Sequence, residues 1–109
     1  MIKLAKQPQL VRLRAKGESV CPISKTIDVF EAVVEYAPRG AAIELEEFKK
    51  IIDSYRGKEI LQEELAVDLL EKIRAAVNPA YIKVTIKSTY MGIDIEAIAE
   101  SGGVHTAYI

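Results

Sequence analysis

Apolar and polar residues alternate along residues 10–16, and this alternation predicts a half-buried β-strand. The apolar positions are Val11, Leu13 and Ala15, and the cationic positions facing the other way are Arg12, Arg14 and Lys16. We expect residues 17–22 to form a connection. Residues 27–36 are rich in β-branched and aromatic side chains, which favours a second, well-buried strand. A Pro-Arg-Gly sequence at 38–40 then ends that strand.

The hydrophobic period changes to that of a helix after residue 44. Apolar side chains recur at helical spacing at Leu45, Phe48, Ile52 and Tyr55. Gly57 is expected to end this helix. A second helix is predicted over 61–77, where apolar residues at every fourth position form a row before Asn-Pro at 78–79 stops it.

Two further alternating segments, 81–89 and 93–100, predict a closing pair of strands joined by a hairpin at Met91-Gly92. Lysines of the first segment would face acids of the second across the ladder. The order is β-β-α-α-β-β, which indicates one α+β domain over 1–109 with two helices on one face of an antiparallel four-stranded sheet. Such a sheet has open edges, and assembly of several copies into a closed barrel would pair them.

Charge and composition narrow the class of protein. The formal net charge of −1 argues against a protein that coats nucleic acid by bulk attraction, but the first sixteen residues carry five cations and no acid. These cations either form a solvated edge that prevents strand pairing or guide a polyanion. No apolar run is long enough to span a membrane, and we see no targeting segment, so a cytoplasmic location is expected.

The only cysteine, Cys21, is the best candidate for covalent chemistry. A single thiol cannot form an internal disulfide, and without further soft ligands it cannot hold a structural zinc, so we expect no metal. Asp28 lies seven positions later and supplies a possible acid–base partner. The alternative is that Cys21 is a small buried hydrophobe. His105, the only histidine, lies in a Gly-flanked tail and is expected to be mobile or at an interface.

The element order resembles that of the tunnelling fold (T-fold), and Cys21-Pro22-Ile23-Ser24, followed by Asp28, resembles the cysteine-to-aspartate motif of the 7-cyano-7-deazaguanine reductases. The resemblance implies that Cys21 adds to the nitrile carbon and that Asp28 handles protons. It also implies that Glu63 anchors the deazaguanine edge, next to Gln62, which stands where the reductases have histidine. Ser24 is expected either to bond near the ring or to bond only to local backbone.

One departure from the reductases changes the expected reaction. The stretch Glu44-Leu45-Glu46-Glu47 stands where the reductases carry their NADPH motif, and its extra carboxylates would repel cofactor phosphates. In this respect the chain is similar to the QueF-like archaeosine synthases, and the resemblance implies an amidinotransferase without a cofactor. Its substrates would be tRNA carrying 7-cyano-7-deazaguanine, and ammonia, and its product the formamidine of archaeosine.

The same resemblance implies a homo-oligomer of stacked rings, a decamer of two pentamers. Arg12, Arg14 and Lys16 are then candidates for tRNA phosphate contacts. Two alternatives stay open: an NADPH-dependent nitrile reductase, and a purine-binding T-fold module without catalytic activity.

Overall fold

A computed structural model describes residues 1–102 and confirms the α+β order of the main elements. The elements are β1 (Ile2–Lys3), β2 (Val11–Val20), β3 (Ile27–Ala37), β4 (Ala41–Ala42), α1 (Leu45–Asp53), α2 (Gln62–Val77), β5 (Tyr81–Tyr90) and β6 (Ile93–Gly102). The short ladder between β1 and β4 was not predicted. His105 lies outside the described residues.

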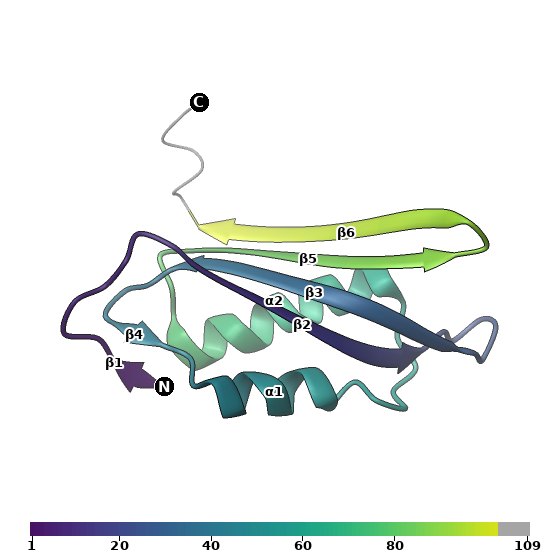
Figure 1. Cartoon of the computed structure of the whole chain (residues 1–109), viewed down its shortest axis with the longest axis horizontal. Coiled ribbons are helices and arrows are strands. Elements are labelled where there is room, and N and C mark those ends of the chain that lie inside the picture. Colours follow the sequence, from purple (N-terminus) through teal and green to yellow (C-terminus); the bar gives the residue numbers. More distant parts are fainter. Residues whose placement is uncertain (103–109) are drawn as a thin grey trace.

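The main sheet has the order β2-β3-β5-β6, with every neighbouring pair antiparallel. Both helices cover one face of it, α1 next to β2 and α2 across β5 and β6 (Figure 1). The core lies between the helices and this face. Its sheet side is formed by alternate residues of the two central strands: Phe30, Ala32, Val34, Tyr36, Ile82, Val84 and Ile86.

Strand β2 runs to Val20, so the predicted connection over 17–22 is wrong for residues 17–20. The reason is that Gly17 acts as a strand residue in close contact with the core. A Cβ at this position would lie 2.7 Å from the Phe30 ring and 2.9 Å from Ile52. Glycine therefore lets α1 approach the strand here and does not mark a turn.

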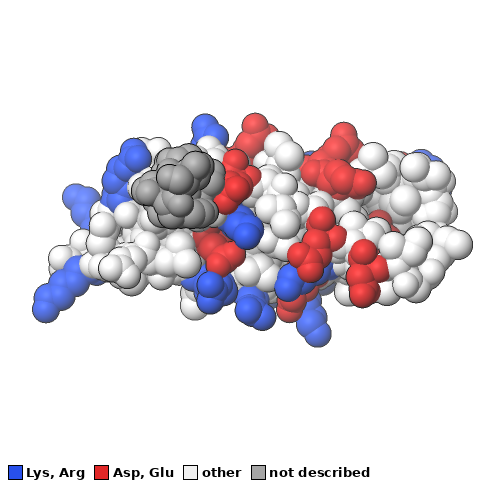
Figure 2. Space-filling view, turned by 90° about the horizontal axis from the view of Figure 1, so that it is seen from above, with Lys and Arg blue, Asp and Glu red and all other residues white. Residues whose placement is uncertain are grey.

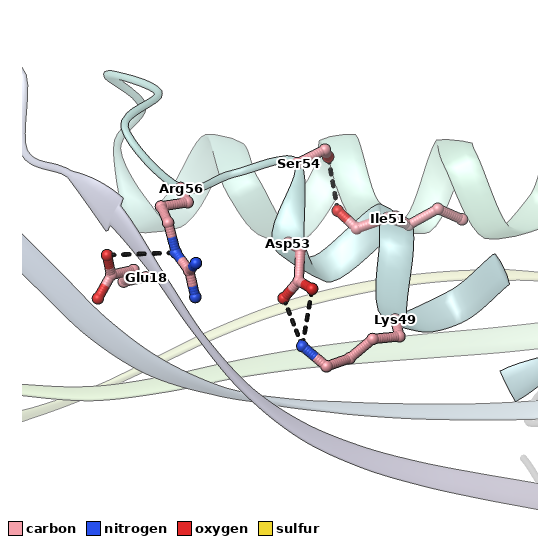
Figure 3. Close-up of polar contacts among 6 residues, drawn as sticks. All are labelled: Glu18, Lys49, Ile51, Asp53, Ser54 and Arg56. Atoms are coloured by element: carbon pink, nitrogen blue, oxygen red, sulfur yellow. Dashed lines mark hydrogen bonds and ion pairs between the residues drawn. The ribbon is translucent and has the colours of Figure 1, made fainter. Parts of the chain in front are cut away.

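The first helix is shorter than predicted, because α1 ends at Asp53 and a turn carries the chain to Gly57. The hydroxyl of Ser54 donates to the carbonyl of Ile51 at 2.6 Å, so one carbonyl group of the last helical turn has a hydrogen-bond partner (Figure 3). Gly57 has φ +78°, a conformation that suits glycine and allows the chain to turn back toward the sheet.

The segment after this turn is attached to the end of β2. Arg56 pairs with Glu18 at 3.5 Å (Figure 3). The amide of Val20 donates to the carbonyl of Lys58 at 2.9 Å, and the amide of Ile60 donates to the carbonyl of Val20 at 3.0 Å. These bonds hold the start of α2 beside the point where β2 ends.

The helix-free face of the sheet carries two rows of alternating charge. Across β2, β3, β5 and β6, one row is Arg12, Glu35, Lys83 and Glu100, and the other is Lys16, Glu31, Lys87 and Glu96. The predicted pairing of lysines with acids between the last two strands is thus confirmed. Figure 2, which looks at the molecule from above Figure 1, shows acids gathered over its middle and right-hand part.

Neither helix in the described part of the chain is long and apolar enough to cross a membrane.

Candidate active site

Cys21 lies at the end of β2, where a tight turn leads into β3. The Cys21 amide donates to the carbonyl of Thr26 at 2.9 Å, and the Lys25 amide donates to the carbonyl of Cys21 at 2.8 Å. Lys25 adopts φ 60°, which closes the turn. Ser24 and Thr26 share a hydrogen bond of 2.7 Å between their hydroxyls. The turn therefore presents the thiol, half-buried, at one end of the sheet.

The same turn makes the thiol more acidic. The Ser24 hydroxyl, followed by the backbone amides of Ser24 and Ile23, stabilises the thiolate and lowers the pKa of Cys21 below that of an ordinary cysteine. Partial desolvation and the negative charge of Asp28 act in the opposite direction and raise this pKa. The turn, rather than the carboxylate, is what favours the reactive form of the sulfur.

Replacing Ser24 with alanine is therefore expected to raise the pKa of Cys21. At neutral pH the thiolate fraction falls, and the rate of alkylation by iodoacetamide should reach half its maximum at a higher pH than in the wild type. Measuring this rate against pH in both proteins checks the expectation. Identical profiles would show that the hydroxyl does not act on the sulfur.

Cys21, Asp28, Gln62 and Glu63 line one cavity of about 120 Å³. Asp28 reaches it from the start of β3, where it follows the alternation that also turns Phe30 toward the helices. Gln62 and Glu63 reach it from the first turn of α2. Residues far apart in the sequence, each singled out by sequence reasoning, thus converge at one end of the sheet. Ser24 is not among the residues that line the cavity.

Gln62 and Glu63 differ in their surroundings. Gln62 is only 6% exposed, and neither atom of its amide has a hydrogen-bond partner among residues 1–102. An unpaired buried polar group of this kind costs about 1–3 kcal/mol. Glu63 is exposed at the rim of the cavity, where it can accept hydrogen bonds from a bound molecule.

Sequence reasoning missed the other lining residues of this cavity, which are Leu61, Ser88, Tyr90 and Ile95. The signal was present in the alternation of β5. Its even-numbered residues from Ile82 to Ile86 face the core, and continuing the pattern places Ser88 and Tyr90 on the same side. These residues add two apolar side chains and the hydroxyls of Ser88 and Tyr90 to the thiol, the carboxylates and the amide.

The three cations proposed to meet tRNA lie on the helix-free face of β2, away from the helices. Arg12 is engaged by Glu35, which accepts from its Nε at 2.9 Å and from its Nη2 at 2.8 Å. Arg14 stands opposite Val33 and forms no ion pair within the described chain, and neither does Lys16. Arg14 and Lys16 are therefore more available than Arg12 for phosphate contacts.

The acids expected to disfavour a phosphate-bearing cofactor lie around the start of α1. Glu44 and Glu47 approach the N-terminal ammonium group at 3.9 and 3.6 Å, and Glu46 is exposed. In residues 1–102 no three His, Cys, Asp or Glu side chains are grouped so that they could hold a metal ion.

Comparison with known proteins identifies relatives of this chain. A family model described as QueF-like protein matches residues 28–106. A curated archaeosine synthase from Pyrobaculum calidifontis is 67% identical over 109 residues, the full length of both chains. The crystal structure of the archaeosine synthase QueF-Like in the apo form has a TM-score of 0.88 and 70% identity, covering 91% of this chain and 99% of that one.

The reductases are more distant relatives. An NADPH-dependent 7-cyano-7-deazaguanine reductase from Thermosynechococcus vestitus is 35% identical over 86 residues, which are 79% of this chain and 58% of that protein. The curated archaeosine synthase, in contrast, matches over the full length of both chains. With its T-fold architecture and the cysteine–aspartate cavity at one end of the sheet, the chain belongs to the QueF-like family.

Proposed function

We propose that this protein is an archaeosine synthase, an amidinotransferase that converts the nitrile of 7-cyano-7-deazaguanine in tRNA to the formamidine of archaeosine. The full-length identity of 67% to a curated archaeosine synthase supports the activity. The observation that carries the proposal is the cavity in which the thiol of Cys21, the carboxyl of Asp28 and the amide of Gln62 meet. A tRNA substrate also implies action in the cytoplasm.

In the first step the Cys21 thiolate attacks the nitrile carbon, and a carbon–sulfur bond forms as the carbon–nitrogen triple bond becomes a double bond. Asp28 takes the proton that the Cys21 thiol gives up and delivers a proton to the nitrile nitrogen, so the product is a neutral thioimide and Asp28 is again a carboxylate. The lowered pKa of Cys21 supports this step, because the thiolate is the nucleophilic form.

In the second step ammonia adds to the thioimide carbon. The carbon–sulfur bond then breaks, the thiol regains a proton, and a formamidine leaves the site. No electrons are transferred overall, so the reaction needs no hydride donor. Asp28 is placed to move protons in this step as well, since it lines the cavity together with Cys21.

Glu63 and Gln62 are proposed to hold the ring during both steps. The Glu63 carboxylate accepts hydrogen bonds from the guanine-like N–H groups at the rim of the cavity, and the N–H donor of the buried Gln62 amide faces the ring, which leaves its Oε1 acceptor uncommitted. Ser24 acts through the thiol rather than on the ring, because it lies outside the cavity lining but lowers the pKa of Cys21.

Incubation of the protein with tRNA carrying 7-cyano-7-deazaguanine and ammonium, followed by nucleoside analysis, tests the function. We expect archaeosine to appear only when both substrates are present. A parallel reaction with NADPH in place of ammonium tests the reductase alternative. Oxidation of NADPH with formation of the aminomethyl base would overturn the amidinotransferase assignment.

The protein is further proposed to act as a ring-forming oligomer, a decamer of two stacked pentamers. Within one chain the cavity holds about 120 Å³, less than the roughly 300–1,000 Å³ of typical ligand sites, so a neighbouring chain would complete it. The two sheet edges are complementary, because β2 presents cations and β6 presents Glu96 and Glu100 on the same face. Pairing β6 of one copy with β2 of the next would continue the alternating charge rows around a closed sheet.

Reversing one charge on the cationic edge is expected to weaken this assembly. Arg14→Glu leaves the internal ion pairs intact, since Arg14 faces Val33, but places an acid against the acidic edge of the next copy. Native mass spectrometry should show a shift from the ten-chain species to smaller ones. Lys50→Glu, an exposed charge reversal on α1, is the matched control and should leave the assembly unchanged. Equal assembly of both variants would remove the β2 edge from the interface.

Binding to tRNA is expected to weaken steeply with salt. If the two available cations of β2, Arg14 and Lys16, each meet one phosphate, affinity should fall roughly 12-fold between about 50 and 200 mM monovalent salt. The free nitrile base carries no phosphate, so its rate of adduct formation serves as a control that should barely change. Equal tRNA affinity at the two salt concentrations would count against phosphate contacts of this kind.

A further inference from the structure

A second buried polar side chain lies beside the candidate active site without a partner. Ser19 is 1% exposed, and its Oγ has no hydrogen-bond partner among the described residues. Together with the Gln62 amide, it makes two almost fully buried polar side chains with unmet hydrogen-bonding capacity. Gln62 lines the cavity itself, whereas Ser19 adjoins it through its ladder partner Asp28, which is a lining residue. Buried polar groups in folded proteins are normally paired, so both groups have hydrogen-bonding capacity that a small polar ligand could use.

Both side chains are neighbours of Asp28. Ser19 is the direct cross-strand partner of Asp28 in the β2–β3 ladder, and side chains at paired positions project from the same face of a sheet. Gln62 lines the same cavity as Asp28. The hydrogen bonds between Val20 and the segment from Lys58 to Ile60 hold this start of α2 next to the strand that carries Ser19.

In the second step of the proposed reaction, ammonia is a small polar ligand that hydrogen-bond acceptors can hold. Ammonium in water has N–H donors but no lone pair, so it must be held by acceptors and lose a proton before it can attack carbon. Ser19 Oγ and Gln62 Oε1 are neutral acceptors, and the Asp28 carboxylate is an acceptor that can also take a proton. Neutral oxygens hold N–H groups without favouring the cation as strongly as further carboxylates would.

We infer that Ser19, Gln62 and Asp28 form a subsite for the ammonia nucleophile, an inference that rests on the proposed function. Ammonium enters with its N–H groups on Ser19 Oγ and Gln62 Oε1 and gives one proton to Asp28. The freed lone pair forms the new carbon–nitrogen bond at the thioimide carbon. The carbon–sulfur bond then breaks, and the sulfur leaves as a thiolate that is protonated again before the next cycle.

Ser19→Ala separates this role from the first step. Because Ser19 Oγ has no partner to lose in the free chain, the variant should keep its thermal midpoint and form the thioimide with the free nitrile base at the wild-type rate. The KM for ammonium in amidine formation should rise about tenfold, the effect of one lost hydrogen bond at a polar ligand. Methylamine should gain relative to ammonia as a nucleophile, because the deleted hydroxyl leaves space.

Two further variants complete the test. Ser19→Thr retains the hydroxyl and should restore a low KM for ammonium. Thr85 in β5 is a comparably buried residue whose hydroxyl lies on the other face of the sheet from Ser19. Thr85→Val removes this hydroxyl and should leave the KM for ammonium unchanged.

An unchanged KM for ammonium in Ser19→Ala, alongside normal thioimide formation, would overturn the subsite and leave the proposed function standing. So would a loss of thioimide formation equal to the loss of amidine formation, since the hydroxyl would then act before ammonia binds. A wild-type protein that forms no thioimide at all overturns both proposals.

Discussion

Cys21→Ala is expected to lose the covalent adduct with the free nitrile base and to lower formamidine formation by about 10³-fold or more. The wild-type chain should gain the mass of one nitrile base, because the thioimide retains every atom of both reactants. The loss is large because the thiol is the nucleophile and no other group in the cavity can replace it, since the hydroxyls of Ser88 and Tyr90 are far weaker nucleophiles at neutral pH. Intact-protein mass spectrometry with and without base measures both outcomes.

The chain is well suited to this test because it contains one cysteine. An adduct can therefore be assigned to Cys21 without peptide mapping, and binding that survives Cys21→Ala must be non-covalent or lie elsewhere. Asp28→Asn should form the adduct more slowly while removing the charge that raises the pKa of the thiol. An adduct of the same mass on Cys21→Ala, or none on the wild type, would refute the assignment of the nucleophile.

Sequence patterns predicted the layers of this fold and failed mainly at positions where a contact outweighs local preference. The alternation of β5 and β6 and the helical period of α2 come from burial on one face, which the sequence records directly. Gly17 falls in the connection predicted over 17–22, whereas in the structure it is a strand residue that makes room for Phe30 and Ile52. Its packing partners come from distant segments, so no local pattern could identify them.

In the candidate site, too, some features could be predicted from the sequence and others depend on contacts between distant segments. Cys21, Asp28, Gln62 and Glu63 were indicated by resemblance to a family motif, and the cavity that they line was not predictable from their spacing. Ser19 carries no motif at all. Its relevance depends on the register that sets it opposite Asp28 and on burial that leaves its hydroxyl unpaired. Register and burial are properties of the packed chain rather than of any short segment.

The turn that follows Cys21 and the carboxylate of Asp28 have opposite effects on the pKa of the thiol. The turn from Cys21 to Thr26 lowers the pKa of the thiol through the Ser24 hydroxyl and backbone amides, while Asp28 opposes that shift. Because the negative charge of Asp28 disfavours the thiolate, Asp28 does not stabilise the nucleophile. Its carboxyl group can instead exchange protons with the nitrile nitrogen and with ammonia. We therefore assign activation of the sulfur to the turn and proton transfer to Asp28.

Glu63→Gln is expected to weaken binding of the nitrile base by about 10- to 150-fold, corresponding to about 1.5–3 kcal/mol for hydrogen bonds to a charged acceptor. The substitution keeps the shape of the side chain but replaces one acceptor oxygen with an N–H donor, which would face the N–H groups of the ring. Because Glu63 is exposed in the first turn of α2 and makes no ion pair within residues 1–102, the fold should be unaffected.

Binding should be measured in the Cys21→Ala background by isothermal titration calorimetry, so that affinity is separated from adduct formation. Glu71→Gln is the matched control, because Glu71 is an exposed acid on the same helix that does not line the cavity with Cys21. A loss confined to Glu63→Gln supports direct contact with the ring, whereas equal losses in both variants would indicate only the overall negative charge of α2. Unchanged affinity in Glu63→Gln would remove this residue from the site and leave the buried Gln62 amide as the group from α2 that contacts the substrate.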